Sequence, residues 1–169
     1  MEIRDARAGD AAVIAEIYND AVRHTTAIWN DATVDTENRE RWIAERQGSG
    51  FPVLVVVDAD GAVLGYASYA QWRPFDGYRH TVEHSVYVRA DQRGAGHGRA
   101  LMRALITRAR GSGIHVMVAG IDASNSGSIR LHEALGFTVA GTVPQVGAKF
   151  GTWLDLTFMS LVLDDRAQP

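Results

Sequence analysis

Apolar residues in the first third of the chain recur at spacings of three and four, which is the period of an amphipathic α-helix. This pattern predicts one helix over 10–22 and a second helix over 36–47. Asp10 and Asp35 stand where the two patterns begin, and each is expected to cap its helix. Trp42 belongs to the apolar side of the second pattern, so we expect that helix to bury it.

Apolar runs predict strands in much of the remaining chain. Residues 52–58 and 62–70 form two such runs, and the Asp60-Gly61 pair between them is a hairpin signal. Further strands are expected over 2–6, 81–89, 114–121, 137–143 and 153–163, and further helices between Gly98 and Gly111-Ser112-Gly113 and over 126–135. Strands that first pair as hairpins and later alternate with helices predict a mixed α/β sheet.

A glycine-rich loop joins the strand over 81–89 to the helix that follows. Gly94, Gly96 and Gly98 alternate with other residues, and an apolar pattern of helical period comes directly after them. Glycines at such positions let backbone N–H groups approach a ligand closely, and the helix N-terminus behind them adds partial positive charge. The loop is therefore a candidate phosphate site, although a plain strand-to-helix turn would have the same composition.

The spacing of this loop selects among known phosphate motifs. A P-loop requires a lysine after its last glycine, but the only lysine of the chain is Lys149. A dinucleotide fingerprint requires G-x-G-x-x-G, and here the third glycine comes one place early. The pattern that fits is R-x-x-G-x-G, formed by Arg93, Gly96 and Gly98. It resembles the acyl-CoA pyrophosphate loop of the GCN5-related N-acetyltransferases (GNAT).

A second motif supports the same resemblance. Asn125 is followed three positions later by Ser128 and then by a helical pattern that ends in Leu-Gly-Phe at Phe137. Residues 81–88 and 131–136 resemble the phosphinothricin acetyltransferases, and residues 27–30, 72–73 and 144–156 resemble the methionine sulfoximine and methionine sulfone N-acetyltransferases. The resemblance covers nearly the whole chain. It implies an α/β GNAT fold with a mixed central β-sheet flanked by α-helices. The chain length predicts a single acetyltransferase domain, placed over 1–163, and residues 164–169 are expected to form a flexible C-terminal tail.

Composition narrows the partners of this 169-residue chain. The net charge of −3 argues against a general nucleic-acid binder, and the absence of cysteine excludes a thiol nucleophile and a thiolate metal site. The histidines show no metal-ligand spacing, so we expect no metal. The longest aliphatic run, 53–57, is too short to span a membrane, and the N-terminus lacks the apolar core of a signal peptide. We therefore expect a cytoplasmic protein with no membrane partner.

Two side chains are candidates for acid–base chemistry. Glu83 lies inside an apolar strand, where burial would raise its pKa and make it a better proton acceptor. The resemblance also places a glutamate there, whereas the alternative is a structural carboxylate paired with Arg73 or Arg79. His132 stands where many GNAT enzymes carry a tyrosine that protonates the departing thiolate, and it agrees with the phosphinothricin branch. A histidine simply packed on the inner face of its helix is the alternative.

The remaining site residues concern binding. Arg73, flanked by Trp72 and Phe75, has the chemistry to hold the carboxylate of an amino acid, although it could also be an ordinary surface arginine. Other acceptor contacts are expected from Trp29, Pro74, Phe75, Glu83, His84 and Ser85. The resemblance implies acetyl-CoA contacts from Val86, Tyr87, Val88, Arg93, Gly94, Ala95, Gly96, His97, Gly98, Arg99, Asn125 and Ser128.

These residues lead to one expected function. The chain is expected to transfer the acetyl group of acetyl-CoA to the α-amine of a small amino-acid analogue, and the resemblance implies the class of methionine sulfoximine, methionine sulfone and phosphinothricin. The alternatives are another amine (a polyamine, an aminoglycoside or a protein N-terminus) or an acyl-CoA sensor without turnover. The segment 143–156 mixes polar residues with Phe150 and Trp153, and its apolar content predicts a homodimer contact.

Overall fold

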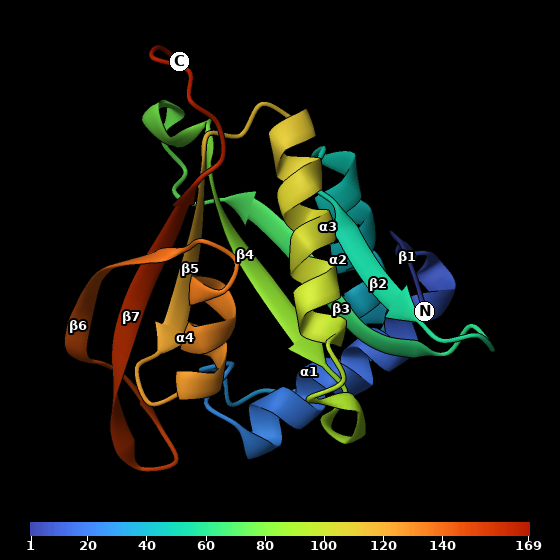
Figure 1. Ribbon diagram of the computed structural model, residues 1–169. Helices are drawn as coiled ribbons and strands as arrows, with labels where there is room; N and C mark the ends of the chain where they lie inside the picture. The colour runs from blue at the N-terminus through green and yellow to red at the C-terminus, as the bar shows by residue number, and fades with distance from the viewer. The chain divides into compact units, whose positions relative to one another are not determined.

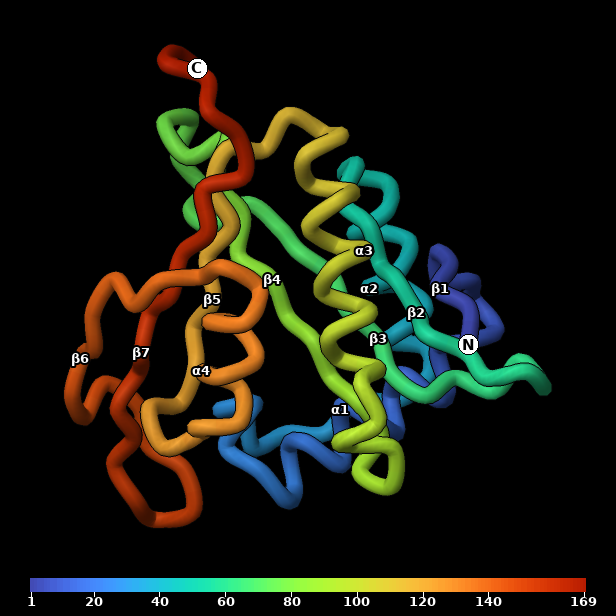
Figure 2. The backbone as a smooth tube through the Cα atoms, in the orientation of Figure 1, coloured from blue at the N-terminus to red at the C-terminus, as the bar shows by residue number.

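The computed structural model describes residues 1–169 and contains a seven-stranded sheet in the order β1-β2-β3-β4-β5-β7-β6 (Figures 1 and 2). The strands are β1 (Glu2–Asp5), β2 (Val53–Val57), β3 (Val63–Gln71), β4 (Thr81–Val88), β5 (Val116–Asp122), β6 (Thr138–Lys149) and β7 (Thr152–Val162). The helices are α1 (Ala11–His24), α2 (Thr36–Gly48), α3 (His97–Gly111) and α4 (Ser126–Glu133). β4 and β5 run parallel, whereas β5 and β7 run antiparallel, so the predicted mixed α/β sheet is confirmed.

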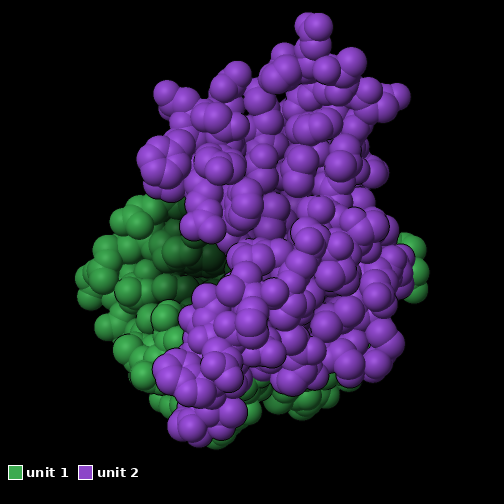
Figure 3. Space-filling view, turned by 90° about the vertical axis from the view of Figure 1, so that its left-hand side faces the viewer, with its two compact units in different colours: residues 1–70, 85–105 green, residues 71–84, 106–169 purple.

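The chain groups into two compact units, which Figure 3 distinguishes by colour. One unit contains residues 1–70 and 85–105, and the other contains residues 71–84 and 106–169. The chain passes from one unit to the other at the end of β3, inside β4 and inside α3. The expectation of one domain over 1–163 stays a prediction.

The core of the first unit forms where α1 and α2 pack against β2. The five consecutive aliphatic residues of β2 are all buried. Every second one, Val53, Val55 and Val57, shares a core cluster with apolar side chains of both helices, among them Ile14, Ile17 and Ile43. Trp42 is only partly buried, which corrects the expectation from the helical pattern. Its ring lies edge-on to Tyr66, with centroids 6.0 Å apart, while the Arg39 guanidinium lies 5.0 Å from its centroid.

The two predicted helix caps have different outcomes. Asp35 caps α2, because its carboxylate accepts a hydrogen bond from the backbone N–H of Asn38 at 2.8 Å. Asp10 does not cap α1 with its side chain, so that prediction was wrong. Its carboxylate instead accepts from the backbone N–H of Arg7 and pairs with the Arg4 guanidinium, both at 2.7 Å. A short 3-10 turn therefore precedes α1, and Asp10 ties that turn to β1.

The second unit contains a long hairpin formed by β6 and β7. The sequence predicted a strand over 137–143, but β6 continues to Lys149. Pro144 is compatible with this extension, because β6 is an edge strand and a proline there costs no ladder hydrogen bond. The pairing register shifts between Val143 and Gly147, where Gln145 has a φ of 53° and donates its N–H to the Asp155 carboxylate at 2.7 Å. The hairpin therefore contains a bulge that the strand signal did not reveal.

The C-terminal residues make contacts with the segment that precedes β5. His115 Nδ1 lies 2.7 Å from the Asp164 carboxylate, and the Arg166 guanidinium donates to the backbone oxygen of Gly113 at 2.7 Å. Flexibility of the tail over 164–169 stays a prediction. None of the helices has both the length and the apolar character that crossing a membrane would require.

Candidate active site

The glycine loop has the backbone conformation that its sequence demands. Gly94 and Gly96 have φ values of +80° and +87°, which lie in the left-handed region that residues with a Cβ rarely adopt. No atom lies within 4 Å of the position that a Cβ would take at either residue, so the loop is open on that side. The first helical hydrogen bond of α3 runs from the N–H of Ala100 to the Gly96 oxygen at 3.0 Å. The loop thus ends at a helix N-terminus, whose first N–H groups have no partners within the helix.

The two arginines of the loop have different surroundings. Arg93 is directed back toward its own unit, because its guanidinium lies 3.3 Å from the Asp20 carboxylate of α1 and 3.4 Å from the Val88 oxygen. These contacts support the shape of the loop. Arg99 lies exposed in the first turn of α3. Of the two cations, Arg99 is therefore the better placed to meet an anionic group at the helix N-terminus.

The strand that leads into the loop is held close to β3 by a glycine that sequence reasoning missed. A Cβ at Gly65 would lie 2.7 Å from the backbone oxygen of Tyr87 and 3.2 Å from the Cα of Val88. The Tyr87 ring packs against Tyr66 with a centroid distance of 5.3 Å, and Val86, like Tyr87 and Val88, is partly buried. Gly65 therefore sets where the last residues before the loop lie. An isolated glycine in a strand pattern was the available signal.

Glu83 of β4 lies over the neighbouring strand β5. It stands opposite Val118 in the parallel register, and its Oε1 is 3.0 Å from the position that a Cβ on Gly120 would occupy. Partial burial raises the pKa of the Glu83 carboxyl, and the positive charge of Arg73 opposes this rise. Arg79, the other proposed partner, donates to the Asp76 oxygen instead. The carboxyl is thus a partly desolvated proton acceptor influenced by one cation.

Arg73 is supported by aromatic rings, but not by both of the rings expected. Its guanidinium lies 5.1 Å from the centroid of the Trp72 ring. Trp72 in turn meets Tyr78 and Phe158 edge-on, with centroid distances of 5.4 and 6.4 Å. Phe75 is 66% exposed and makes no ring contact in this group. Sequence reasoning missed Tyr78 and Phe158, because only the folded loop and β7 bring them beside Trp72.

A pair of histidines occupies the opposite face of β4. Successive side chains of a strand point to opposite faces, and His84 accordingly packs against α4, with its Nε2 3.0 Å from the Nε2 of His132. The planes of the two rings are nearly parallel, at 17°, and Phe137 meets both edge-on. Burial lowers the pKa of His84 to about 3 and also lowers the pKa of His132. Both imidazoles are therefore neutral at physiological pH.

Hydrogen-bond chemistry fixes which nitrogen of each ring carries the proton. The Ser128 oxygen can only accept, so the 2.7 Å contact with His132 Nδ1 places a proton on that nitrogen. The Nε2 of a neutral His132 is then an acceptor, and the proton between the rings belongs to His84 Nε2. His84 Nδ1 consequently holds a lone pair and makes no hydrogen bond within the protein. In this state His132 has no uncommitted proton for a leaving group.

Asn125 and Ser128 form the first turn of α4. The Asn125 side-chain oxygen accepts from the Ser128 N–H at 3.0 Å, so Asn125 acts as the N-cap that was one of its two interpretations. Its side-chain NH₂ remains a candidate ligand contact. Ser128 orients His132 through its backbone oxygen, while its hydroxyl lies 3.5 Å from the same imidazole nitrogen.

The remaining residues expected to contact the acceptor have fewer interactions with the rest of the site. Pro74 and Ser85 are exposed, and the indole N–H of Trp29 donates to the Thr26 oxygen at 2.8 Å within the first unit. No group of three or more histidine, aspartate or glutamate side chains is arranged to hold a metal ion. Within residues 71–84 and 106–169, the structure gathers Glu83 with Arg73 and its aromatic support, and it joins His84 to His132.

Comparison with known proteins agrees with both motifs. A family model described as an acetyltransferase (GNAT) domain matches residues 3–158. The chain is 61% identical over 162 residues to the L-methionine sulfoximine/L-methionine sulfone acetyltransferase of Pseudomonas aeruginosa, which covers 96% of this chain and 94% of that protein. It is 59% identical over 169 residues to the L-amino acid N-acyltransferase MnaT of Escherichia coli, which covers 100% of this chain and 98% of the relative.

A solved structure gives the same result at the level of the fold. An acetyltransferase of Salmonella typhimurium, solved with its cofactor acetyl-CoA, matches with a TM-score of 0.97 and 60% sequence identity. The match covers 100% of this chain and 97% of that one. The R-x-x-G-x-G loop, the asparagine motif and the mixed sheet therefore have a common explanation, which is that this chain belongs to the GNAT acetyltransferase family and has its fold.

Proposed function

We propose that the protein transfers the acetyl group of acetyl-CoA to the α-amine of a small amino-acid analogue of the methionine sulfoximine and methionine sulfone class. The observation that carries this proposal is the pairing of Glu83 with Arg73, a carboxylate and a guanidinium that influence each other without forming an ion pair. An α-amino acid has an ammonium and a carboxylate of opposite sign to these groups. The names of the relatives from Pseudomonas aeruginosa and Escherichia coli support an amino-acid acceptor.

The glycine loop is the proposed site of the CoA pyrophosphate. Its positive φ values and the open space beside Gly94 and Gly96 fit a backbone cradle that any larger side chain would fill. When bound, acetyl-CoA would supply the acetyl group, and CoA would be released as the free thiol. The N–H groups from Arg93 to Arg99 would hold the phosphates, with Val86, Tyr87 and Val88 leading into the loop.

The loop assignment has a direct test. Gly96→Val puts a branched side chain into the open space and onto a φ of +87°. CoA affinity should fall by roughly 2 kcal/mol or more, the scale of lost charge-assisted hydrogen bonds. Calorimetric titration of the folded variant with CoA measures this. Gly113→Ala is the matched control, because that glycine also has a positive φ, of +71°, but precedes β5. Equal CoA affinity of the Gly96 variant and wild type would remove the loop from the site.

Glu83 is the proposed base for the acceptor ammonium. Its raised pKa brings the carboxyl closer to the pH at which proton transfer is most efficient, and its partial exposure leaves it accessible. Arg73, stacked on Trp72, would take the acceptor carboxylate through its fork of N–H donors. His132 is the second proposed catalytic residue. Its Nδ1–H is donated to the Ser128 oxygen and its Nε2 accepts from His84, so it could accept a proton only when the contact with His84 opens.

A turnover screen with acetyl-CoA tests the acceptor class. Methionine sulfone and methionine sulfoximine should be acetylated, and the amine analogue of methionine sulfone that lacks the carboxylate should lose most of its kcat/KM. Phosphinothricin, spermidine and a peptide with a free N-terminus complete the panel. Faster turnover of spermidine or the peptide would replace the amino-acid proposal, and acetyl-CoA binding without turnover of any amine would indicate a sensor.

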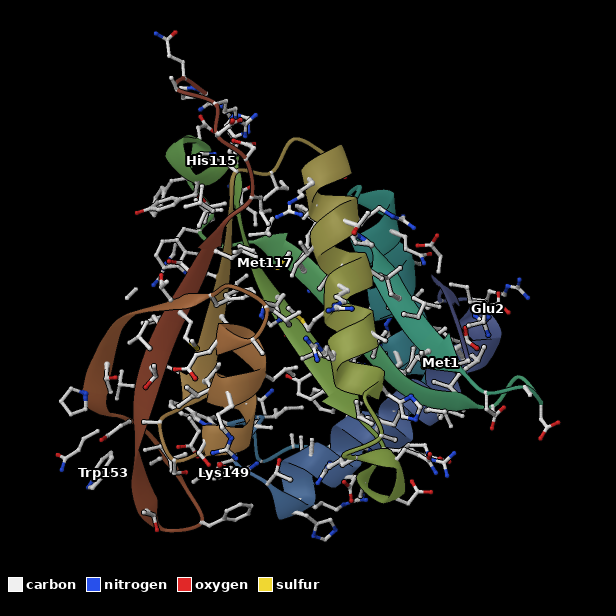
Figure 4. The ribbon with its side chains drawn as sticks, in the orientation of Figure 1. Met1, Glu2, His115, Met117, Lys149 and Trp153 are labelled. Atoms are coloured by element: carbon white, nitrogen blue, oxygen red, sulfur yellow. The ribbon has the colours of Figure 1, made fainter.

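The proposal includes a homodimer in the cytoplasm. The β6–β7 hairpin leaves several large apolar side chains exposed, among them Val143, Val146, Phe150 and Trp153, the last of them 67% exposed. Figure 4 shows Trp153 projecting from the hairpin. An exposed group of large apolar side chains on one hairpin favours a protein–protein contact over a surface that only meets solvent. Light scattering at micromolar concentration should give twice the chain mass, and a monomer there would reject the dimer.

A further inference from the structure

Gly120 interrupts an otherwise buried strand. Every neighbour from Met117 to Asp122 is buried, whereas Gly120 itself is exposed. A glycine inside a strand weakens it, since it has no side chain to pack and loses more conformational freedom on folding. Its backbone is not in the left-handed region, so the conformation of β5 does not require a glycine at this position. The reason for the glycine must therefore lie in what occupies the space beside it.

That space is occupied by the carboxyl of Glu83. A Cβ on Gly120 would lie 3.0 Å from Glu83 Oε1, 3.5 Å from Leu156 Cδ1 and 3.9 Å from Phe158 Cε1. The 3.0 Å distance is closer than a Cβ normally approaches another heavy atom, whereas the two apolar distances are those of ordinary contact. Glu83 stands opposite Val118, so its side chain reaches along β5 to lie where the Gly120 side chain would be.

Other glycines of the same unit do not share this arrangement. A Cβ on Gly141 of β6 would meet nothing within 4 Å, and a Cβ on Gly127 would meet only the Asn125 side-chain oxygen at 3.7 Å. Gly65, which belongs to the other unit, also makes a close approach, but it does so to the backbone of β4. A side chain there would displace a strand, whereas one at Gly120 would displace only the flexible end of Glu83.

We infer that Gly120 is a positioning residue for Glu83, because it leaves the room that the carboxyl occupies beside β5. This inference rests on the proposed role of Glu83 as the base. An added methyl group would move the carboxyl by a few tenths of an ångström or more while leaving the fold intact. Displacements on the ångström scale cost about 10²-fold in rate when the group takes part in the reaction. The alanine variant should therefore fold normally and turn over slowly.

A double-mutant cycle on kcat for methionine sulfone tests the inference. Gly120→Ala should lower kcat by about tenfold in the wild-type background, a part of the range known for misplaced reacting groups. In the Glu83→Gln background, which already lacks the base, the same change should cost less than about twofold, because coupled residues are not additive. Gly141→Ala is the matched control, since it adds the same methyl group to a strand glycine with open space around it, and its kcat should equal wild type.

The outcomes separate the inference from the function on which it rests. Near-normal kcat in Glu83→Gln would remove Glu83 as the base. A large loss in Glu83→Gln combined with normal kcat in Gly120→Ala, or with equal losses from Gly120→Ala in both backgrounds, would overturn the role of Gly120 alone. If Gly120→Ala lowers Tm, the shorter side chain in Glu83→Asp/Gly120→Ala should restore it. Failure to restore Tm would show that the methyl group meets something other than the carboxyl, and would also overturn the inference.

Discussion

The two faces of β4 carry neighbouring ionisable residues in opposite situations. Glu83 lies partly buried on one face, with its pKa raised by desolvation and Arg73 nearby. His84 lies on the other face, where complete burial beside His132 lowers its pKa to about 3. Burial favours the neutral form of both groups, because each loses the hydration of its charged form. The chemical consequences differ, since one group becomes a stronger base and the other becomes a weaker one.

This difference separates the proposed base from a pair of buried, hydrogen-bonded imidazoles. Raising the pKa of a carboxyl toward neutrality increases its affinity for a proton while the residual exposure keeps it accessible. Lowering the pKa of an imidazole removes its ability to hold a second proton at neutral pH. The His84–His132 pair then serves as a neutral polar link between β4 and α4, with Ser128 as its last acceptor. The comparison therefore favours Glu83 as the proposed base, whereas the proposed role of His132 requires its contact with His84 to open.

Loss of the Glu83 charge should produce the largest effect. Glu83→Gln keeps the shape of the side chain but cannot accept the ammonium proton, so kcat should fall by roughly 10²-fold or more, the usual contribution of a general base. The KM for acetyl-CoA should hardly change. In wild type, kcat/KM should fall as the pH drops through the raised pKa of Glu83, because protonation removes the base. Steady-state kinetics from pH 5 to 9 measures both effects, and a near-normal kcat would return Glu83 to a structural role.

Breaking the histidine pair should affect stability more than rate. His84→Leu leaves the buried Nε2 of His132 without its donor, which should lower the free energy of unfolding by about 1–3 kcal/mol. In His84→Leu/His132→Leu the loss should be smaller than the sum of the two single losses, because neither ring is left unpaired. Urea unfolding measures the cycle. A kcat reduced by more than about tenfold in the well-folded double variant would instead make the pair part of the catalytic machinery.

The sequence predicts those features of the fold and the site that depend on residues close together along the chain. Gly94 and Gly96 indicate a backbone conformation that other residues rarely adopt, and both have positive φ in the structure. Asp35 predicts the start of α2, and its carboxylate does accept from the N–H of Asn38, three positions later. Glu83 was conspicuous because a carboxylate inside an apolar strand needs a reason to be there.

Other features depend on residues that are far apart along the chain. Asp10 was assigned to α1 by its position, but Arg4 and Arg7 bind its carboxylate from the other side. His84 and His132 lie 48 positions apart, so no periodicity reveals their hydrogen bond. Phe158 contacts Trp72, and Gly120 lies beside Glu83, only because β4, β5 and β7 are adjacent in the sheet. Such contacts are decided by topology, which a single sequence expresses only indirectly.

A more conservative change on the Glu83 face should have a moderate effect. Arg73→Lys keeps the positive charge near Glu83 but loses the planar fork and its stacking on Trp72. The KM for methionine sulfone should rise by about tenfold, whereas kcat and the KM for acetyl-CoA should change little, because binding is lost without loss of the base. The amine analogue without the carboxylate is the internal control, since its kinetics should be the same in both enzymes. If the variant discriminates the two acceptors as well as wild type, Arg73 does not hold the carboxylate.

The smallest effect expected is on how the free energy of unfolding depends on pH, which should involve the histidine pair and not Glu83. A histidine whose pKa is lowered by folding binds its proton more readily in the unfolded chain. Protonation of His84 therefore leaves the free energy of unfolding unchanged above about pH 6.5, and lowers it as the pH falls toward the folded pKa of about 3. Between pH 7.5 and 5.5, this linkage should lower the free energy of unfolding of wild type by about 1 kcal/mol through His84 alone. The double leucine variant should lack this decline, whereas Glu83→Gln should keep it, because the carboxylate titrates on the other face. Urea unfolding of the three proteins at the two pH values provides the comparison. An equal decline in the double variant and wild type would show that the imidazoles are not the groups that acid protonates on unfolding, and would remove the physical basis for treating them as a neutral packing pair.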